Sequence, residues 1–283
     1  MLTETEQSRA WDRTVEAEHE QSDKVREPQG DEDFWRPLVK RFTPRSAEDE
    51  EDPTVTAVAP FLSAETTLID VGAGGGRLAI PLAAKCREIT AVEPSDAMVE
   101  QLRAAINERG LSNIRVIQAA WDEAEVAPAN IVLCSHVMYT MTPVAPFVEK
   151  MIEKATDRVI VLLNERQPVA NYFPLWRYVH GEERIQLPAA AEFVALLRAW
   201  DIEPEVQPLP PITFNKFQDK EAAFRASAHR LFVDPHSEKG EVLRRTLDEM
   251  LEPSEDGGVR FPWGTSNVPY VVTWKTPGPH HSE

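Results

Sequence analysis

The sequence predicts an α/β fold in which a mostly parallel sheet lies between two layers of helices. Two observations predict it. From residue 66 onward, short apolar runs rich in β-branched residues alternate with segments of helical periodicity. The first run leads directly into a turn in which glycine fills four of the five positions from Gly72 to Gly76. A strand, a tight turn and a helix N-terminus together place backbone N–H groups where a nucleotide-like ligand can bind.

The elements are expected in a regular order along the chain. Residues 1–53 are predicted to form an N-terminal helical segment or cap, with helices at 8–20 and 31–42. Residues 54–283 are predicted to form one domain, which begins with a helix at 55–62 and carries a helical insertion at about 211–265. The strands are predicted at 66–71, 88–92, 114–118, 131–134, 159–163, near Val206 and at 268–274, and further helices at 78–83, 95–110, 143–154, 188–200, 219–232 and 238–251.

Composition limits the classes of function. The formal net charge is −17, which repels a phosphate backbone and argues against a nucleic-acid partner. No apolar stretch is long enough to cross a membrane, and the first residues lack the features of a signal peptide, so a cytoplasmic protein without a membrane partner is expected. Two cysteines are too few for a disulfide framework. The oligomeric state, including a homodimer, is left open.

The residue at the end of the first strand indicates which ligand the glycine turn holds. A carboxylate at Asp70 would repel an anionic pyrophosphate but would attract a ligand that carries an ammonium and a sulfonium, as S-adenosylmethionine does. The dinucleotide fingerprint G-x-G-x-x-G also fails here, because Arg77 stands where its third glycine belongs. The segment from Asp70 to Gly76 instead resembles the first motif, D/E-x-G-x-G-x-G, of the class I S-adenosylmethionine-dependent methyltransferases. A nicotinamide oxidoreductase is the weaker alternative.

The second strand strengthens the resemblance. Glu93 follows the apolar run at 88–92, about twenty positions beyond the glycine turn, where a carboxylate suits ribose hydroxyls. Pro94 and Ser95 then begin a helix. The string from Ala91 to Met98 is similar to the second methyltransferase motif.

The resemblance covers residues 55–208 and the last strand. It implies a Rossmann-like three-layer sandwich with a seven-stranded sheet whose last strand is antiparallel, and it implies S-adenosylmethionine as cofactor. It assigns Asp70 and the backbone of Gly72 to the methionine moiety, places Ala73 and Gly74 in the glycine turn that contacts the cofactor, and assigns Glu93 and Pro94 to the ribose side.

The third strand tip carries Ala120, Trp121 and Asp122, where the matching family positions flank the adenine. The sequence departs here from the commoner Gly-Asp-Ala pattern. Trp121 could stack on adenine and Asp122 could accept from its exocyclic amine. The alternative is that Trp121 is a packing anchor at the start of a helix.

The fourth strand tip carries Ser135 and His136, in a string similar to the Ser/Ala-His-Val-Leu-Tyr of many small-molecule methyltransferases. Both residues are therefore expected near the methyl donor. A neutral His136 could act as general base, because the pKa of an imidazole ordinarily lies near working pH. The alternative is that His136 only shapes the pocket, since positioning alone supplies much of the acceleration of a methyl transfer.

The expected function is therefore methyl transfer to a small-molecule acceptor. Motifs for methylating exocyclic or amide nitrogens, for magnesium-dependent transfer and for covalent attack by cysteine are missing, and no metal site is predicted. Aromatic residues at 172–180 and in the insertion could line an acceptor pocket, and the helix with Phe34 and Trp35 could close over the cofactor. A methyltransferase acting on protein or RNA, and a non-catalytic S-adenosylmethionine-binding module, stay as alternatives.

Overall fold

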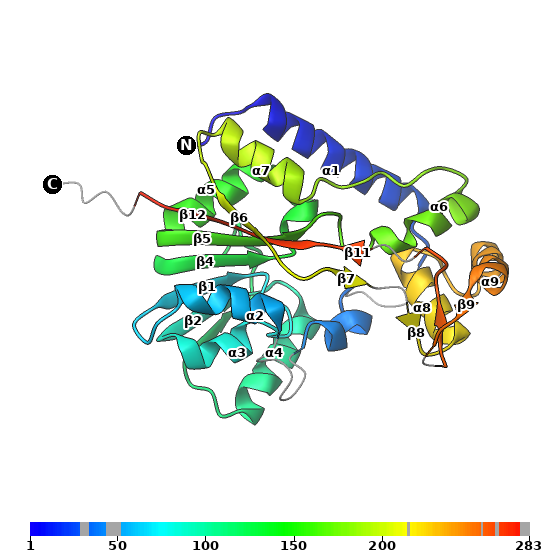
Figure 1. Ribbon diagram of the computed structural model, residues 1–283, viewed down its shortest axis with the longest axis horizontal. Coiled ribbons are helices and arrows are strands. Elements are labelled where there is room, and N and C mark those ends of the chain that lie inside the picture. The colour runs from blue at the N-terminus through cyan, green and yellow to red at the C-terminus, as the bar shows by residue number, and fades with distance from the viewer. Residues whose placement is uncertain (29–33, 44–51, 214–215, 256, 264–265, 278–283) are drawn as a thin grey trace.

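A seven-stranded sheet forms the centre of the molecule (Figure 1). The computed structural model describes residues 1–28, 34–43, 52–213, 216–255, 257–263 and 266–277. The strand order is β3-β2-β1-β4-β5-β12-β6. The strands are β1 (Thr67–Val71), β2 (Glu88–Val92), β3 (Ile114–Ile117), β4 (Ala129–Ser135), β5 (Ala155–Asn164), β6 (Glu205–Pro208) and β12 (Pro269–Lys275).

The direction of the strands confirms the predicted fold class. β1 pairs in parallel with both β2 and β4, β2 with β3, and β4 with β5. β12 runs antiparallel between β5 and β6, with Val271 opposite Leu162 and Gln207. The carboxyl ends of the five parallel strands therefore meet at one edge of the sheet, where ligands of open α/β folds bind.

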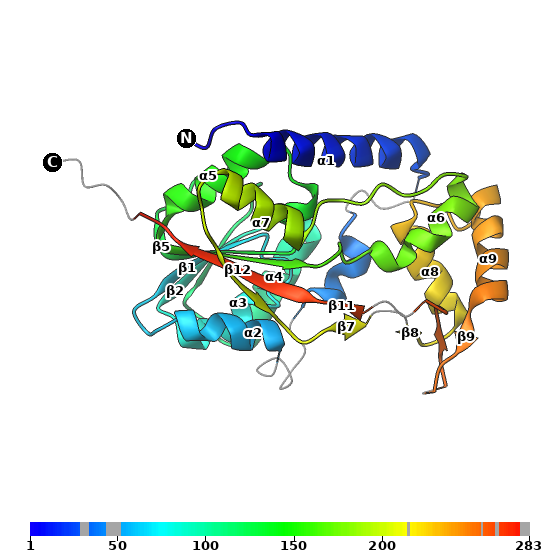
Figure 2. The ribbon, with the colours of Figure 1, turned by 45° about the horizontal axis from the view of Figure 1, so that its top comes forward.

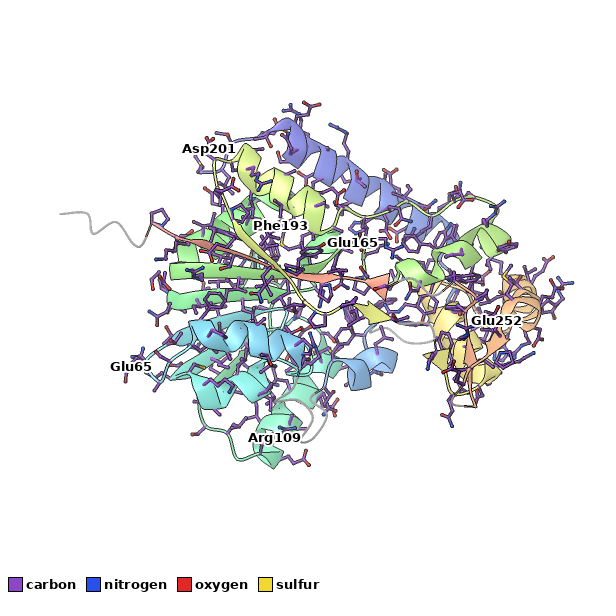
Figure 3. All side chains as sticks on the ribbon, viewed as in Figure 1. Glu65, Arg109, Glu165, Phe193, Asp201 and Glu252 are labelled. Atoms are coloured by element: carbon purple, nitrogen blue, oxygen red, sulfur yellow. The ribbon has the colours of Figure 1, made fainter. Side chains whose placement is uncertain are left out.

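Helices cover both faces of the sheet (Figure 1). One face carries α1 (Glu6–Val25), α5 (Val144–Lys154) and α7 (Ala190–Ala199), and the other carries α2 (Pro53–Val58), α3 (Ala79–Leu82) and α4 (Asp96–Glu108). Phe193 of α7 is fully buried between its helix and the sheet (Figure 3). Val55 and Val58 of α2 pack on the opposite face, against Leu68 of β1. Burial of both faces explains why the parallel strands are continuous apolar runs rather than alternating ones.

A small helical cap lies off the carboxyl edge of the sheet (Figures 1 and 2). It consists of α6 (Phe173–His180), α8 (Lys220–Arg230) and α9 (Glu238–Met250), with a three-stranded sheet of β8 (Lys216–Phe217), β9 (Glu252–Pro253) and β10 (Val259–Arg260). Trp176, Phe224 and Phe261 form its own apolar core. The pair β7 (Ile212–Thr213) and β11 (Ser266–Asn267) leads from the cap back to the main sheet.

Three elements differ from the expected ones. The first helix is longer than predicted, because it continues to Val25 along a surface supplied by the cap. The helix expected at 31–42 is a short 3₁₀ helix, η1 (Arg36–Arg41), and residues 31–33 lie outside the described part of the chain. The cap also begins before the predicted insertion, since α6 packs with α8 and α9. The remaining 3₁₀ helices are η3 (Ala59–Phe61), η4 (Ala83–Lys85), η5 (Met138–Thr140) and η6 (Ala170–Tyr172).

Helix α1 joins the main sheet to the cap (Figure 2). Its first half contacts the sheet side, where Trp11 Nε1 donates to Met141 O at 3.0 Å and Asp12 Oδ1 accepts from Val144 N at 2.9 Å. Beyond its end, Glu27 accepts from Ser237 Oγ at 2.6 Å in the cap. The helix therefore bridges the main sheet and the cap. Within the described residues, no helix has both the length and the apolar character to span a membrane.

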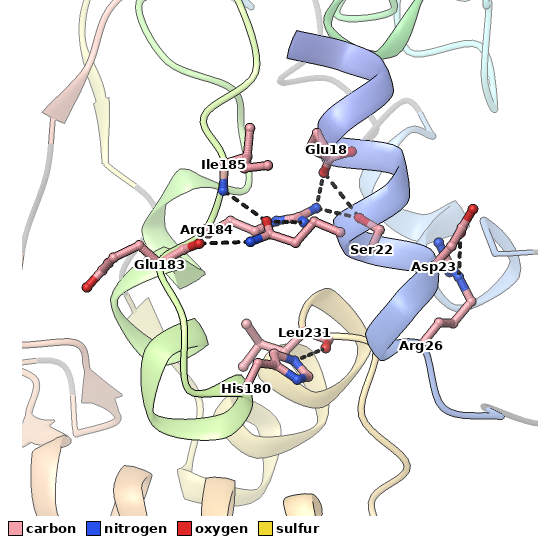
Figure 4. A network of polar contacts seen from close by, with 10 residues as sticks. Glu18, Ser22, Asp23, Arg26, His180, Glu183, Arg184, Ile185 and Leu231 are labelled. Atoms are coloured by element: carbon pink, nitrogen blue, oxygen red, sulfur yellow. Dashed lines mark hydrogen bonds and ion pairs between the residues drawn. The ribbon is translucent and has the colours of Figure 1, made fainter. Parts of the chain in front are cut away.

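The second half of α1 holds the segment after α6 through a buried polar network (Figure 4). Arg184 forms an ion pair with Glu18 and donates to Ser22 Oγ at 2.6 Å. Gln21 Oε1 accepts from Arg184 Nη1 at 3.0 Å and from Ile185 N at 2.9 Å. Burial lowers the pKa of Arg184 to about 10, so the guanidinium stays charged at neutral pH.

Candidate functional site

The glycine turn after β1 is held tightly against the neighbouring strands. Gly72 N and Ala73 N both donate to Val92 O, at 2.8 and 3.1 Å, which draws the turn over the end of β2. Gly72 has φ +71°, and a Cβ built on it would lie 2.4 Å from Cγ2 of Val137. Only glycine fits such a backbone and such a close approach without a rearrangement. The turn therefore lies directly beside the loop after β4.

Residues before the domain cover this turn. Phe42 O accepts from Arg77 N at 3.2 Å, and a Cβ built on Gly74 would lie 3.4 Å from Phe42 Cβ. At the other end of the same segment, the ring of Phe34 stacks on that of His229 in α8, with centroids 4.6 Å apart. Residues 34–43 thus extend from the glycine turn to the helical cap. That the part with Phe34 and Trp35 closes over the cofactor stays a prediction.

Asp70 is a buried carboxyl at the end of β1. Its side chain is 2% exposed, and Oδ2 has no hydrogen-bond partner among the described residues. Burial raises its pKa to about 7, and Glu93 adds to the effect while Arg77 opposes it. A buried carboxylate of this kind is stabilised by a cation or by hydrogen-bond donors.

Glu93 at the end of β2 faces the glycine turn. Its Oε2 accepts from Gly74 N at 2.8 Å, and its Oε1 accepts from Ser95 N at 2.9 Å. These bonds place the carboxylate at the glycine turn, where the resemblance expects the ribose. The adjacent Pro94 is exposed, and it is Glu93 rather than Pro94 that accepts the hydrogen bond from Gly74 N. The structure therefore brings the predicted first and second tips together.

The third tip is divided between core and surface. Trp121 is 5% exposed, its Nε1 donates to Phe147 O at 3.3 Å, and Lys150 Nζ lies 5.0 Å from its ring centroid. This placement corresponds to the packing alternative rather than to an aromatic surface open to adenine. Ala120 is partly exposed and Asp122 is exposed, so both remain available to a ligand.

The fourth tip holds His136 in an uncommon backbone conformation. Its φ is +60°, which is sparsely populated by residues other than glycine, and its backbone N donates to Leu162 O at 2.9 Å. Such strain tends to occur at functional sites. Next to it, Ser135 Oγ is buried and lacks a hydrogen-bond partner among the described residues.

The imidazole of His136 is fixed by Tyr139. The two rings are parallel to within 4°, and His136 Nδ1 lies 3.2 Å from the Tyr139 hydroxyl. Burial, with help from Arg77, lowers the pKa of His136 to about 3. The pKa of His136 therefore lies below the expected range near working pH, because partial burial of the ring disfavours its charged form. His136 is neutral at pH 7 and is only a weak base.

Two polar residues, one at the end of β5 and one just beyond it, were not singled out from the sequence. Asn164 ends β5 with 1% exposure and Gln167 follows with 2% exposure, directly after Glu165 (Figure 3) and Arg166. Asn164 Oδ1 and both amide atoms of Gln167 lack hydrogen-bond partners among the described residues. The available sequence signal was the change from an apolar run to polar residues at a strand end.

Comparison with known proteins assigns the central part of the chain. Residues 68–159, from β1 to the middle of β5, match the model of a family described as a methyltransferase domain. This central part of the chain is therefore similar to a methyltransferase domain. Its sheet order, antiparallel last strand and glycine turn agree with that assignment.

Curated relatives match the chain over a limited length. Ribosomal RNA small subunit methyltransferase G of Neisseria gonorrhoeae is 31% identical over 109 residues, which are 35% of this chain and 52% of that protein. A Pyrobaculum aerophilum protein, named provisionally as ribosomal RNA small subunit methyltransferase A, is 30% identical over 116 residues, or 40% and 47% of the two chains. The chain thus spans about half the length of these relatives.

Solved structures show the same fold over more of the chain. A Bacillus halodurans protein with a provisional assignment as a methyltransferase superposes with a TM-score of 0.56 at 15% identity, covering 80% of this chain and 99% of that one. The Bacillus subtilis protein YcgJ gives 0.54 at 14% identity, with the same two coverages of 80% and 99%. At such identities the likeness concerns the fold.

The residues present fit S-adenosylmethionine. Asp70 offers a buried carboxylate to a cationic ligand, Gly72 permits close approach of the backbone, and Glu93 offers carboxylate oxygens beside the turn. Within the described residues, no three histidine, cysteine or acidic side chains gather as metal ligands would.

Proposed function

We propose that this protein transfers a methyl group from S-adenosylmethionine to a small-molecule acceptor. The observation that carries the proposal is Asp70, a carboxyl that is 2% exposed, lacks a partner at Oδ2 and stands at the glycine turn. Burying a carboxylate is costly unless a cation or donor compensates it. An ammonium-bearing ligand seated at the turn supplies that compensation, whereas a pyrophosphate would add repulsion.

Each strand tip has a role in this proposal. Asp70 and the backbone of Gly72 hold the methionine moiety, and Glu93 holds the ribose, supported by its place beside Gly74 N. Ala120 and Asp122 border the adenine. Ser135 and His136 lie at the β4 tip, toward the transferred methyl.

Positioning is the main catalytic contribution. S-adenosylmethionine supplies a methyl carbon on a sulfonium: the acceptor lone pair forms the new bond while the carbon–sulfur bond breaks and sulfur keeps its electron pair. The strand tips hold the two partners in line, and such alignment alone can lower a barrier by several kcal/mol, about 7–11 in well-oriented intramolecular reactions. The low pKa of His136 disfavours a general-base role and favours hydrogen bonding to the acceptor.

The charges near the site support a small acceptor over a nucleic acid. Arg77 is paired with Asp52, and Arg166 Nη2 donates to Ser266 O at 2.9 Å. These basic side chains close to the strand tips are therefore already engaged, and the chain as a whole has a net charge of −17. Phosphate-binding surfaces usually carry several available Lys and Arg side chains.

Methylation of RNA is the second candidate. The curated relatives are named as ribosomal RNA methyltransferases, and these names favour this candidate. Their similarity to the chain extends over about half the length of each relative. Under this alternative, the acceptor site would bind an RNA segment, and binding would weaken steeply with salt.

Thermal unfolding with added ligands tests the proposed function. S-adenosylmethionine and its demethylated product should each stabilise the protein, whereas NAD should not. A ligand at about one hundred times its dissociation constant adds roughly 2.7 kcal/mol. Stabilisation by NAD alone would contradict the role of Asp70, and stabilisation by none of the three would favour a protein that does not bind this cofactor. Salt-sensitive binding of small-subunit ribosomal RNA would favour the second candidate.

A further inference from the structure

A set of uncharged polar side chains lies at the ends of β4 and β5, beside the tips assigned to the methyl donor. Tyr139 connects two of the residues at these ends, His136 and Asn164. The phenol oxygen accepts from Asn164 N at 2.6 Å and lies 3.2 Å from His136 Nδ1. One hydroxyl thus contacts the backbone of β5 and the imidazole of the β4 loop.

These bonds favour one position of the proton on the His136 ring. The Tyr139 oxygen already accepts the Asn164 N–H, so its own hydrogen needs an acceptor. Among the described residues, the acceptor within reach is His136 Nδ1. Burial also raises the pKa of Tyr139, so the phenol keeps its proton. This arrangement favours His136 Nδ1 as the acceptor, with the hydrogen on Nε2.

The segment after β5 keeps its backbone satisfied and leaves its side-chain amides without partners. Glu165 N donates to Val268 O at 2.7 Å, and Arg166 N donates to Asn267 Oδ1 at 3.0 Å. Asn164 Oδ1 and the two amide atoms of Gln167 are buried with no partner among the described residues. Buried polar groups are nearly always paired, because an unmade bond costs about 1–3 kcal/mol. A buried amide without hydrogen-bond partners, on a segment whose backbone is held by hydrogen bonds, indicates that a ligand binds there.

The set carries no formal charge. The nearest acidic groups of the site, Asp70 and Glu93, belong to the tips of β1 and β2. Glu165 is exposed, and Arg166 bonds to a backbone carbonyl of β11. An ion placed among buried amides without a counter-charge would lose its hydration without compensation.

We propose that His136, Asn164 and Gln167 form the acceptor subsite, and that it binds an uncharged group presenting both hydrogen-bond acceptors and donors. His136 Nε2–H and the Gln167 amide nitrogen donate, whereas Asn164 Oδ1 and Gln167 Oε1 accept. A carboxamide or lactam has this complement, whereas a carboxylate or phosphate does not. The proposal rests on the proposed function, because it names the acceptor that the methyl donor would meet.

Substituting Gln167 by methionine tests the subsite by stability. Methionine keeps the length of the side chain and removes both amide atoms, so Gln167→Met should raise the Tm of the free protein by about 2–4 °C. Gln207→Met, at an exposed position of β6, is the matched control and should leave the Tm unchanged. An unchanged or lowered Tm in Gln167→Met would mean that the amide has a structural partner, which overturns the proposal.

Binding of two small probes tests the ligand class. Benzamide and benzoate have the same shape and differ in charge. With the protein saturated with S-adenosylhomocysteine, saturation-transfer NMR should detect benzamide more strongly than benzoate, and the benzamide signal should fall at least threefold in Gln167→Met but not in Gln207→Met. Equal or stronger binding of benzoate, an unaffected variant, or no benzamide signal would each overturn the subsite. Binding of S-adenosylhomocysteine itself reports separately on the proposed function.

The protonation of His136 provides a third readout. Long-range ¹H–¹⁵N NMR should show a neutral ring with hydrogen on Nε2 between pH 6 and 8. Tyr139→Phe should remove this preference. A ring with hydrogen on Nδ1 in the unmodified protein would contradict the proposed donor role.

Discussion

Asp70 shows how one residue can link ligand binding to pH. Its carboxyl is buried, which raises its pKa to about 7 in the free protein, well above the ordinary value for an aspartate. A raised pKa means that the folded protein holds the proton more tightly than the unfolded chain, so the carboxyl contributes less stability as pH rises from about 4 to 7. A cation bound beside Asp70 reverses this penalty, because it favours the ionised form.

Affinity for S-adenosylhomocysteine should therefore depend on pH. Binding needs the Asp70 carboxylate, so the dissociation constant should rise toward tenfold per unit as the pH falls below about 7. Calorimetry in buffers of different ionisation enthalpy would count the proton released at pH 6. Asp70→Asn should weaken binding at pH 8 and remove the dependence, whereas Asp201→Asn, at an exposed position, should do neither. A pH-independent affinity in the unmodified protein would refute the role of Asp70.

At the scale of elements, the glycine turn is where local sequence and local structure agree most closely. The turn from Gly72 to Gly76 lies between β1 and α3, and its backbone bonds reach the end of β2. Gly72 and Gly110 both have φ near +65°, at +71° and +62°. They differ in surroundings: a Cβ on Gly72 would meet Val137, whereas a Cβ on Gly110 would meet nothing within 4 Å.

This difference separates backbone strain from close approach. Gly110→Ala should cost about 1–2 kcal/mol of stability, since a left-handed alanine carries that penalty, and should leave S-adenosylhomocysteine binding unchanged. Gly72→Ala should cost more and weaken binding at least tenfold, because Val137 or the turn must move. Denaturant unfolding and calorimetry on both variants check this. Equal effects of the two changes on binding would show that close approach at Gly72 does not matter.

The site was predictable where its parts are adjacent in sequence. Asp70 and Glu93 follow apolar runs whose strand character is evident, so their meeting at one edge followed from parallel pairing. The role of Trp121 could not be decided, because packing on Phe147 and Lys150 depends on residues 26 and 29 positions away. The lowered pKa of His136 depends on burial, which no local pattern encodes. Phe42 over the glycine turn and the unpaired amide of Gln167 likewise arise from tertiary contacts.

At the scale of the whole molecule, the position of the helical cap depends on α1. Glu18 and Arg184 form a buried pair, with side chains 9% and 5% exposed. The guanidinium also lies 4.1 Å from the ring centroid of Trp176 in the cap. Removing one member of such a pair leaves a charge without its counter-ion in a region that excludes water.

Glu18→Ala should therefore lower the free energy of unfolding by about 3 kcal/mol. Glu4→Ala, which removes an exposed partner of Arg9, should change it little, because surface pairs are largely solvated. Urea unfolding monitored by tryptophan fluorescence compares the two variants. Equal urea midpoints for the two variants would mean that the buried pair is not needed to hold the cap on α1.

The position of α1 also affects the order in which the chain folds. Gln21 bonds to Ile185, 164 residues later, and Glu27 bonds to Ser237, 210 residues later. During synthesis on the ribosome, α1 emerges long before either partner residue. Its polar face therefore stays exposed to water while the central sheet is still being synthesised. Contacts of such sequence separation close late, since the loop entropy is lost before the bonds form. The first helix in the sequence is thus among the last to reach its final place.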